Sequence, residues 1–156
     1  MKEEPPWDNR ERSFRFACDI VRFCRNLSKD PGCRRIADQL VDAGTSVGAN
    51  SEEAKAAYSR REFAVKNSIA LKEARESAFW LRVIMTCELT DDPEARRLLN
   101  EAGQLVGIFT ATVRSAKQEK EKGKTLEGKR KVSLLPFAFF FFPFALQISP
   151  VQRPAR

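Results

Sequence analysis

The sequence contains no histidine, one tyrosine and only seven glycines in 156 residues. Without histidine, the chain cannot form zinc sites with imidazole ligands or a Ser-His or Cys-His nucleophile pair. The low glycine content, together with 42% hydrophobic and 31% charged residues, is typical of a helical chain with one packed domain. These absences argue against the commonest hydrolases and zinc enzymes, and we expect no enzymatic activity and no cofactor.

The four cysteines, Cys18, Cys24, Cys33 and Cys87, include no C-x-x-C pair, so an all-cysteine zinc site would lack its usual spacing. The N-terminal stretch does not have the pattern of a secretory segment. We therefore expect small, mostly buried thiols in a cytoplasmic protein.

The formal net charge of +7 is concentrated in the last part of the chain. Residues 1–121 hold 21 Lys and Arg against 20 Asp and Glu, whereas residues 122–156 hold seven against one. This composition does not indicate a globally basic binding face. Any affinity for phosphates must come from local clusters or from the assembly of several copies.

Hydrophobic periodicity predicts four helices and no strand. Apolar residues recur at helical spacing in residues 14–27, 36–58, 63–88 and 98–116, and the first stripe includes Phe14 and Val21. Similar helix lengths, about 28 residues for the last three, and short connections favour antiparallel neighbours. We expect an all-α, antiparallel up-down-up-down four-helix bundle in residues 1–122.

Local signals predict where the helices begin. Asp30-Pro31-Gly32 is expected to separate the first two helices, with Asp30 as N-cap, and Thr90-Asp91-Asp92-Pro93 is expected to precede the fourth. Ser59-Arg60-Arg61-Glu62 has the pattern of a capping box, in which Glu62 reaches back to the Ser59 amide.

Gly44 and Gly48 interrupt the apolar row of the second predicted helix, within a run of small residues from 43 to 50. A glycine weakens a helix by roughly 1 kcal/mol relative to alanine, so a compensating contact is expected. We interpret the run as a tight crossing of two helices. The alternative is a phosphate-binding loop, although neither G-x-G-x-x-G nor G-K-[ST] occurs.

Residues 123–156 are predicted to lie outside the bundle, as a flexible basic linker from Gly123 to Lys131 and an apolar run from Val132 to Ile148. Six of the 12 phenylalanines lie in residues 137–144, and the run of 17 residues contains two prolines. It is shorter than the ~20 apolar residues of a membrane-spanning helix. We interpret it as a poorly ordered extension, and a membrane-surface anchor is the alternative.

A series of motifs between residues 13 and 118 carries a family resemblance. They are Gln39-Leu40, Thr45-Ser46-Val47-Gly48-Ala49-Asn50, Glu52-Glu53-Ala54, Ser59-Arg60-Arg61-Glu62-Phe63, Ser68-Ile69-Ala70-Leu71-Lys72-Glu73-Ala74-Arg75-Glu76-Ser77 and Phe79-Trp80. Together they resemble the bacterial four-helix-bundle family that includes the 23S rRNA intervening-sequence proteins. The chain departs from the commoner family pattern after Asn50, where Ser51-Glu52-Glu53-Ala54 stands in place of Ile-Ala-Glu-Gly.

The resemblance implies a homo-oligomeric bundle with no catalytic residue to transfer. In a related branch, the accessory (Avd-like) proteins of diversity-generating retroelements, a ring of five bundles binds a reverse transcriptase and nucleic acid. By this resemblance we expect a pentameric adaptor that binds RNA or DNA or docks a reverse transcriptase. A protein–protein scaffold without nucleic-acid contact is the alternative.

Two basic clusters are the candidate nucleic-acid-binding residues. Arg34 and Arg35 precede the second apolar stripe, and Arg60, Arg61 and Lys66 begin the third. Ordinary solvated surface is the alternative. Repeated around a ring of subunits, either cluster could form a basic band that binds phosphates in a salt-dependent way.

Two further groups of residues stand out from an ordinary bundle. The aromatic residues Phe16, Phe23, Phe79 and Trp80 are predicted to form a subunit interface, with core packing as the alternative. We expect a structural polar network, and no metal, from a set of carboxylates and one amide: Asn50, Glu53, Glu62, Glu73 and Glu76. The alternative, a two-metal site in the bundle core, ordinarily needs Glu-x-x-His.

Overall fold

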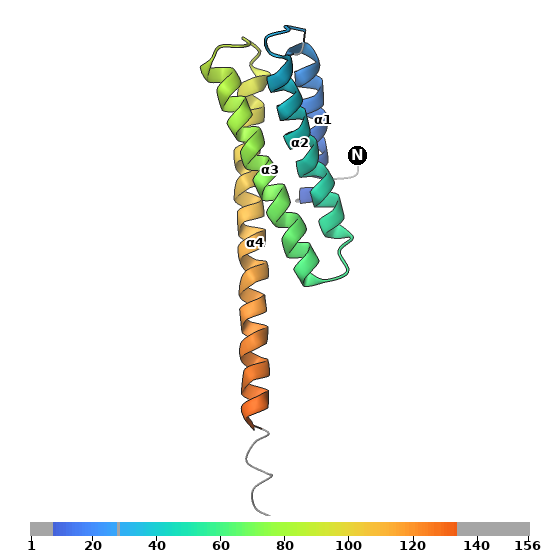
Figure 1. Cartoon of the computed structure of the whole chain (residues 1–156), viewed down its shortest axis with the longest axis vertical. Helices are drawn as coiled ribbons and strands as arrows, with labels where there is room; N and C mark the ends of the chain where they lie inside the picture. The colour runs from blue at the N-terminus through green and yellow to red at the C-terminus, as the bar shows by residue number, and fades with distance from the viewer. Residues whose placement is uncertain (1–7, 28, 134–156) are drawn as a thin grey trace, which may run out of the picture. The chain divides into compact units, whose positions relative to one another are not determined.

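The computed structural model describes residues 8–27 and 29–133, with side chains as far as residue 118, and all regular structure in these ranges is helical. The elements are α1 (Asn9–Leu27), α2 (Arg34–Lys55), α3 (Arg60–Thr86) and α4 (Glu94–Ser133). Successive helices run in opposite directions (Figure 1). The predicted all-α four-helix fold is confirmed.

The chain divides into two compact units, Met1–Glu119 and Lys120–Arg156. In the second unit, residues 120–133 are the last part of α4, so the expected flexible linker from Gly123 to Lys131 is wrong: this segment is helical. Its lysines and arginine favour a helix, and Gly123 and Gly128 each oppose it by only about 1 kcal/mol. Most of the apolar run, from residue 134 onward, lies outside the described residues. No described helix is long and apolar enough to cross a membrane.

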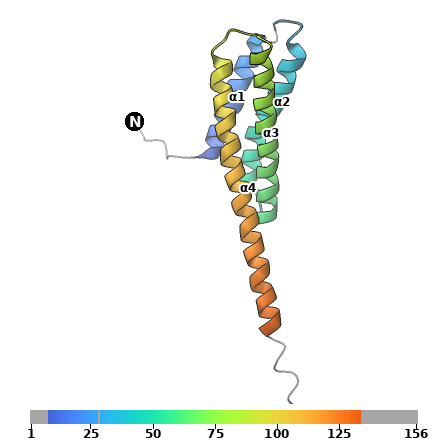
Figure 2. The ribbon, with the colours of Figure 1, turned by 90° about the vertical axis from the view of Figure 1, so that its left-hand side faces the viewer.

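All four helices contribute to the core of the first unit. The two views in Figures 1 and 2 place one helix at each corner of the bundle. Ion pairs close the α1–α4 side, where Arg12 Nε lies 2.5 Å from Glu101 Oε1 and Arg97 Nη2 lies 2.6 Å from Asp19 Oδ2. The largest fully buried side chains are Phe16, Ile20, Leu40, Val47, Leu81, Ile84, Leu98, Leu105 and Phe109.

The glycines of α2 mark a close approach to α1. A Cβ atom on Gly44 would lie 2.8 Å from Ile20 Cγ2, and a Cβ atom on Gly48 would lie 3.3 Å from Ala17 Cβ. Both glycines are buried inside an unbroken helix. The predicted tight crossing is therefore confirmed, and the alternative of a phosphate-binding loop is wrong.

The helix ends differ from prediction where side chains bond locally. Asp30 is not the N-cap of α2: its Oδ1 accepts a hydrogen bond of 2.8 Å from the Gly32 amide, which stabilises a turn, and the helix begins later. Because α2 also ends at Lys55, it has 22 residues, while α3 has 27 and α4 has 40. The start of α4 follows prediction more closely, since Asp92 Oδ1 accepts from the Glu94 amide at 2.9 Å.

A pair of glycine substitutions tests the crossing. Gly44→Ala should lower the free energy of unfolding by about 1–3 kcal/mol, because the added methyl group overlaps Ile20. Gly103→Ala in α4 is the matched control, since nothing lies within 4 Å of its Cβ position. It should raise stability by about 0.5–1 kcal/mol. Urea unfolding followed by circular dichroism measures both, and a Gly44→Ala chain as stable as the wild type would contradict the tight crossing.

Candidate functional site

The two predicted basic clusters lie at opposite ends of the bundle. Arg34 and Arg35 begin α2, whereas Arg60 and Arg61 follow the connection after its end, and all four are exposed. The 22 residues of α2 separate the clusters by about 33 Å at the standard helical rise. The structure therefore does not bring the two clusters together, and each must be judged by its own surroundings.

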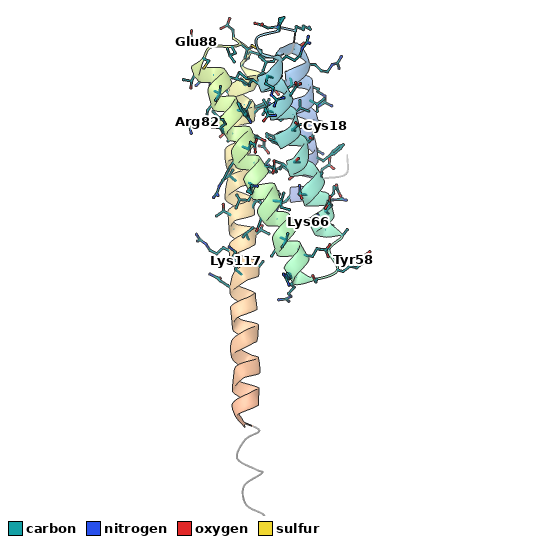
Figure 3. All side chains as sticks on the ribbon, in the orientation of Figure 1. Cys18, Tyr58, Lys66, Arg82, Glu88 and Lys117 are labelled. Atoms are coloured by element: carbon teal, nitrogen blue, oxygen red, sulfur yellow. The ribbon has the colours of Figure 1, made fainter. Side chains whose placement is uncertain are left out.

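The first turn of α3 packs beside α4. A recess of about 400 Å³ is lined by Arg60 and Phe63 of α3 and by a stretch of α4 that contains Thr112 and Ser115. Arg114 and Lys117 lie on the same stretch, both exposed. Figure 3 shows Lys117 and Tyr58 at this end of the bundle.

Lys55, Arg60, Arg61, Arg114 and Lys117 thus share one end of the first unit, which we name the basic end. Sequence reasoning missed Lys55, Arg114 and Lys117, because each is unremarkable among nearby charges in its own segment. The packing of α3 against α4 places Arg114 and Lys117 at the end that carries Arg60, and the short connection after α2 places Lys55 there. The sequence did contain one signal for such a site: Arg114 and Lys117 are three residues apart and therefore lie on the same face of α4.

Nearby acidic side chains have partners of their own. Glu53 forms an ion pair with Lys66, and Glu52 lies 3.5 Å from Arg10. Lys66 is thus half-buried and paired, so it contributes less to a phosphate-binding surface than predicted. The carboxylate of Glu62 accepts a hydrogen bond from the Tyr58 backbone amide.

The opposite end of the bundle is electrostatically mixed. The connections α1–α2 and α3–α4 both lie there (Figure 1). They carry Asp30, Glu88, Asp91 and Asp92 near Arg34 and Arg35. The positive field should consequently be stronger at the basic end.

A capping box fixes the turn between α2 and α3. Ser59 Oγ accepts from the Glu62 amide at 3.1 Å, as predicted. Glu62 Oε2, however, accepts from the Tyr58 amide at 3.0 Å, and not from that of Ser59. The turn therefore holds Tyr58, whose side chain is 98% exposed, immediately before the two arginines.

Four members of the predicted polar network have separate partners. Asn50 donates to the Ser46 carbonyl of its own helix at 2.9 Å, and Glu76 accepts from the Trp80 indole one turn away at 3.4 Å. Glu53 instead pairs with Lys66 of α3, and Glu62 accepts from the Tyr58 amide, so each of these groups has a partner of its own. Within the described ranges, no group of three or more Cys, Asp or Glu residues could hold a metal ion. The predicted network comprises Asn50, Glu53, Glu62, Glu73 and Glu76, and for Glu73 it remains a prediction.

The four aromatic residues assigned to a subunit interface divide into two pairs. Phe16 and Phe23 are buried within this chain, so the interface prediction is wrong for them and core packing accounts for both. Phe79 is 53% exposed and meets Trp80 edge to face, with ring centroids 5.0 Å apart. For this second pair the interface remains a prediction.

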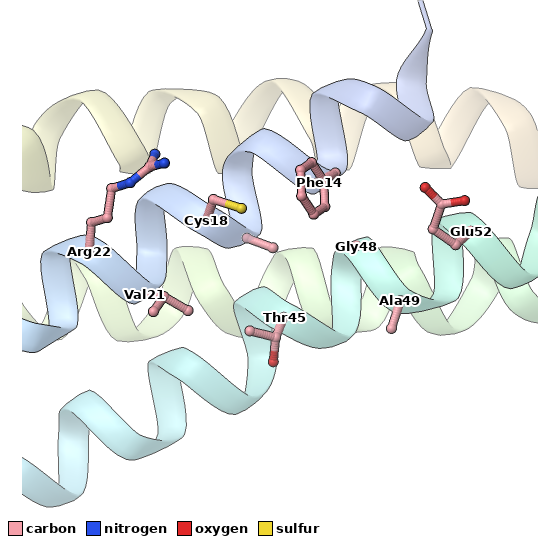
Figure 4. A pocket seen from close by; sticks show the side chains of 9 residues that line it. Phe14, Cys18, Val21, Arg22, Thr45, Gly48, Ala49 and Glu52 are labelled. Atoms are coloured by element: carbon pink, nitrogen blue, oxygen red, sulfur yellow. The ribbon is translucent and has the colours of Figure 1, made fainter.

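A second surface feature is an apolar groove of about 490 Å³ between α1 and α2 (Figure 4). Phe14, Cys18 and Val21 line it from α1, and Arg22 and Glu52 lie toward its two ends. Phe14 and Val21 are 53% and 38% exposed, because the close α1–α2 crossing leaves the edge of the apolar stripe outside the core. We call this surface the α1–α2 groove; sequence reasoning assigned its residues to core packing.

All four cysteines are free thiols. Cys24 and Cys33 are buried, and burial raises the pKa of Cys24 to about 12 and also raises the pKa of Cys33, to which the nearby Asp30 contributes. Both thiols stay protonated near neutral pH and are poor nucleophiles. Cys18 is half-buried in the α1–α2 groove, and Cys87 is exposed.

Comparison with known proteins relates the chain to one family. The profile of the 23S rRNA-intervening sequence protein family matches residues 8–111. The fold is also similar to a crystal structure at 1.70 Å of a protein with unknown function from the S23 ribosomal protein family of Bacteroides thetaiotaomicron VPI-5482. The two share 30% identity and superpose with a TM-score of 0.63, over 67% of this chain and 97% of that one. No curated protein matches the sequence.

The raised thiol pKa predicts a loss of stability in alkali. The unfolded chain releases the Cys24 proton near the ordinary pKa of 9.0, whereas the folded chain holds it to about 12. The stabilisation is complete below pH 9 and is lost as the pH rises toward 12. Urea unfolding at pH 8 to 11 should therefore show a smaller decline for Cys24→Ala than for the wild type. Cys87→Ala, at an exposed position, should follow the wild type, and equal declines in all three would contradict the prediction.

Proposed function

We propose, since the chain belongs to the 23S rRNA-intervening sequence protein family, that it is a non-enzymatic, homo-oligomeric adaptor that binds nucleic acid through its basic end. The observation that carries the proposal is the convergence of cations from α2, α3 and α4 on one end of a bundle whose sequence as a whole is nearly neutral. In this proposal the protein works in the cytoplasm, and docking of a reverse transcriptase is one form that the adaptor role can take.

The chemistry of the basic end suits a phosphate backbone. Arginine and lysine neutralise phosphates and release counterions, which makes such binding steeply dependent on salt. Arginine guanidinium groups also donate paired hydrogen bonds to phosphate oxygens. In a homo-oligomer, for which we propose a pentamer, several basic ends would contact one nucleic acid and raise the affinity through effective concentration.

The side chains of the described residues support a role without catalysis. The two buried thiols are protonated at neutral pH, and three of the carboxylates predicted to converge, those of Glu53, Glu62 and Glu76, have separate partners. An enzyme would need an acid–base pair or an activated nucleophile gathered in one cavity. The surfaces described above offer binding, by charge at one end and by apolar contact at the α1–α2 groove.

A protein–protein scaffold without nucleic-acid contact is the second candidate, and the α1–α2 groove favours it. Exposed apolar surface with polar groups at its rim is typical of protein contacts. The Phe79–Trp80 pair on α3 supplies a second such surface. Under this alternative, both surfaces would bind protein partners, and the basic end would be ordinary solvated surface.

Charge reversal distinguishes the two ends of the bundle. In the full-length chain, Arg60→Glu with Arg61→Glu should weaken binding to a labelled structured RNA at least tenfold and should lower the salt slope by about 2. Arg34→Glu with Arg35→Glu is the matched control and should have a smaller effect, because the connections at that end of the bundle carry acidic residues. Fluorescence anisotropy between 50 and 200 mM salt, repeated with duplex DNA, measures both variants. Equal effects of the two double variants, or none, would contradict the assignment to the basic end.

Self-association is tested with two phenylalanines of equal exposure. Phe79→Glu should shift the mass measured by light scattering toward the 17.7 kDa of one chain, because a charge would be buried in the proposed interface. Phe14→Glu in the α1–α2 groove is the control and should leave the oligomer intact; both residues are 53% exposed, so neither change should unfold the core. Dissociation by Phe14→Glu alone would move the interface to the α1–α2 groove.

A further inference from the structure

Tyr58 is the single tyrosine of the chain and is 98% exposed, although it lies in a short connection between two packed helices. An isolated apolar side chain on a surface is common and by itself indicates nothing. Tyr58, in contrast, stands between Lys55 at the end of α2 and Arg60 and Arg61 at the start of α3. An uncovered aromatic ring among cations is the combination that sequence-tolerant single-strand binders use.

The backbone that carries the ring is held on both sides. The Tyr58 amide donates to Glu62 Oε2, and the preceding amides of Ala56 and Ala57 donate to Glu52 and Ala54 carbonyls, each at 3.3 Å. The capping bond from the Glu62 amide to Ser59 Oγ fixes the following residue. A ligand that contacts Tyr58 therefore meets a backbone that is already ordered, which reduces the entropy lost on binding.

A second aromatic side chain, that of Phe63, lies in the first turn of α3. Phe63 is 38% exposed and forms a wall of the 400 Å³ recess, together with Arg60 and the hydroxyl-bearing Thr112 and Ser115 of α4. Thr112 Oγ1 donates its proton to the Ile108 carbonyl at 3.0 Å, so this oxygen can still accept a hydrogen bond. The recess combines an aromatic face, a guanidinium group and hydroxyls, which together match the faces and edges of a nucleobase.

We infer that the basic end binds unpaired nucleotides, with one base stacked on Tyr58, its flanking phosphates at Arg60 and Arg61, and a neighbouring base in the recess beside Phe63. The inference rests on the proposed function and narrows it from nucleic acid in general to single-stranded segments. In a duplex the base faces are covered by their neighbours, so a duplex can use the cations but not Tyr58. Single-stranded RNA and DNA share the required chemistry.

The test compares substitutions at Tyr58 in the full-length protein. The probes are labelled single strands of about 12 nucleotides, one of oligo-U RNA and one of oligo-dT DNA, and an RNA duplex of the same length. Tyr58→Ala should weaken single-strand binding about tenfold, the loss expected for one stacked base, and should leave duplex binding unchanged. Tyr58→Trp should retain single-strand binding. Phe14→Ala, which removes an exposed aromatic ring distant from the basic end, should change neither.

The outcomes separate this inference from the proposed function. Unchanged single-strand binding by Tyr58→Ala, or an equal loss for duplex and single strand, would overturn the stacking role and leave nucleic-acid binding standing. A wild-type protein that binds only the duplex would also overturn the stacking role and leave nucleic-acid binding standing. A wild type that binds no probe would overturn both proposals. Tighter binding of the RNA strand than of the DNA strand would support a contact to the 2′-hydroxyl in addition to stacking.

A spectroscopic measurement gives an independent readout at the ring. Because the chain has one tyrosine, incorporation of 3-fluorotyrosine yields a single fluorine resonance in the folded protein. Addition of oligo-U should shift this resonance, whereas the RNA duplex at equal occupancy should leave it in place. A resonance that stays unmoved with a saturating single strand would overturn the inference.

Discussion

The close approach of α1 and α2 is the constraint on which the other surfaces depend. Ile20 packs where a side chain on Gly44 would otherwise stand, and Ala17 lies against Gly48 in the same way. Native interiors have few voids, so the two helices can approach this closely only while those positions lack side chains. The approach buries Phe16, Ile20 and Phe23 and leaves Phe14 and Val21 on the outside, where they line the α1–α2 groove. One steric relation thus shapes both the core and an exposed apolar surface.

The order and direction of the helices then determine which charged residues lie at each end of the bundle. Because α2 runs along the bundle, the Arg34–Arg35 pair at its start and the Arg60–Arg61 pair at the start of α3 lie at opposite ends. Two connections that carry acidic residues lie at the same end as Arg34 and Arg35. At the other, α4 adds Arg114 and Lys117 to Arg60 and Arg61, while ion pairs engage the acidic residues at the end of α2. A nearly neutral composition therefore folds into a bundle with one positively charged end.

Polar groups in the bundle are satisfied mainly along single helices. The side chains of Ser13, Asn67 and Ser77 are buried, and each donates to the carbonyl four residues before it. None of the buried side-chain nitrogen or oxygen atoms in the described residues is left without a partner. Because these bonds are local, the core needs no polar network across helices. This favours binding surfaces on the outside of the bundle over a site within it.

Helical periodicity, the Ser59 cap and the run of small residues around Gly44 determined the fold class, the start of α3 and the tight crossing from the sequence alone, because each depends on neighbours within one or two turns. The sequence could not assign Phe16 and Phe23 to the core and Phe14 to the surface, since all three belong to one wide apolar stripe. Nor could it group Arg114 and Lys117 with Arg60, or show that Tyr58 is left uncovered. These outcomes depend on which helix packs against which. Only the tertiary structure decided this, because it relates segments far apart along the chain, such as Arg12 and Glu101, which are 89 residues apart.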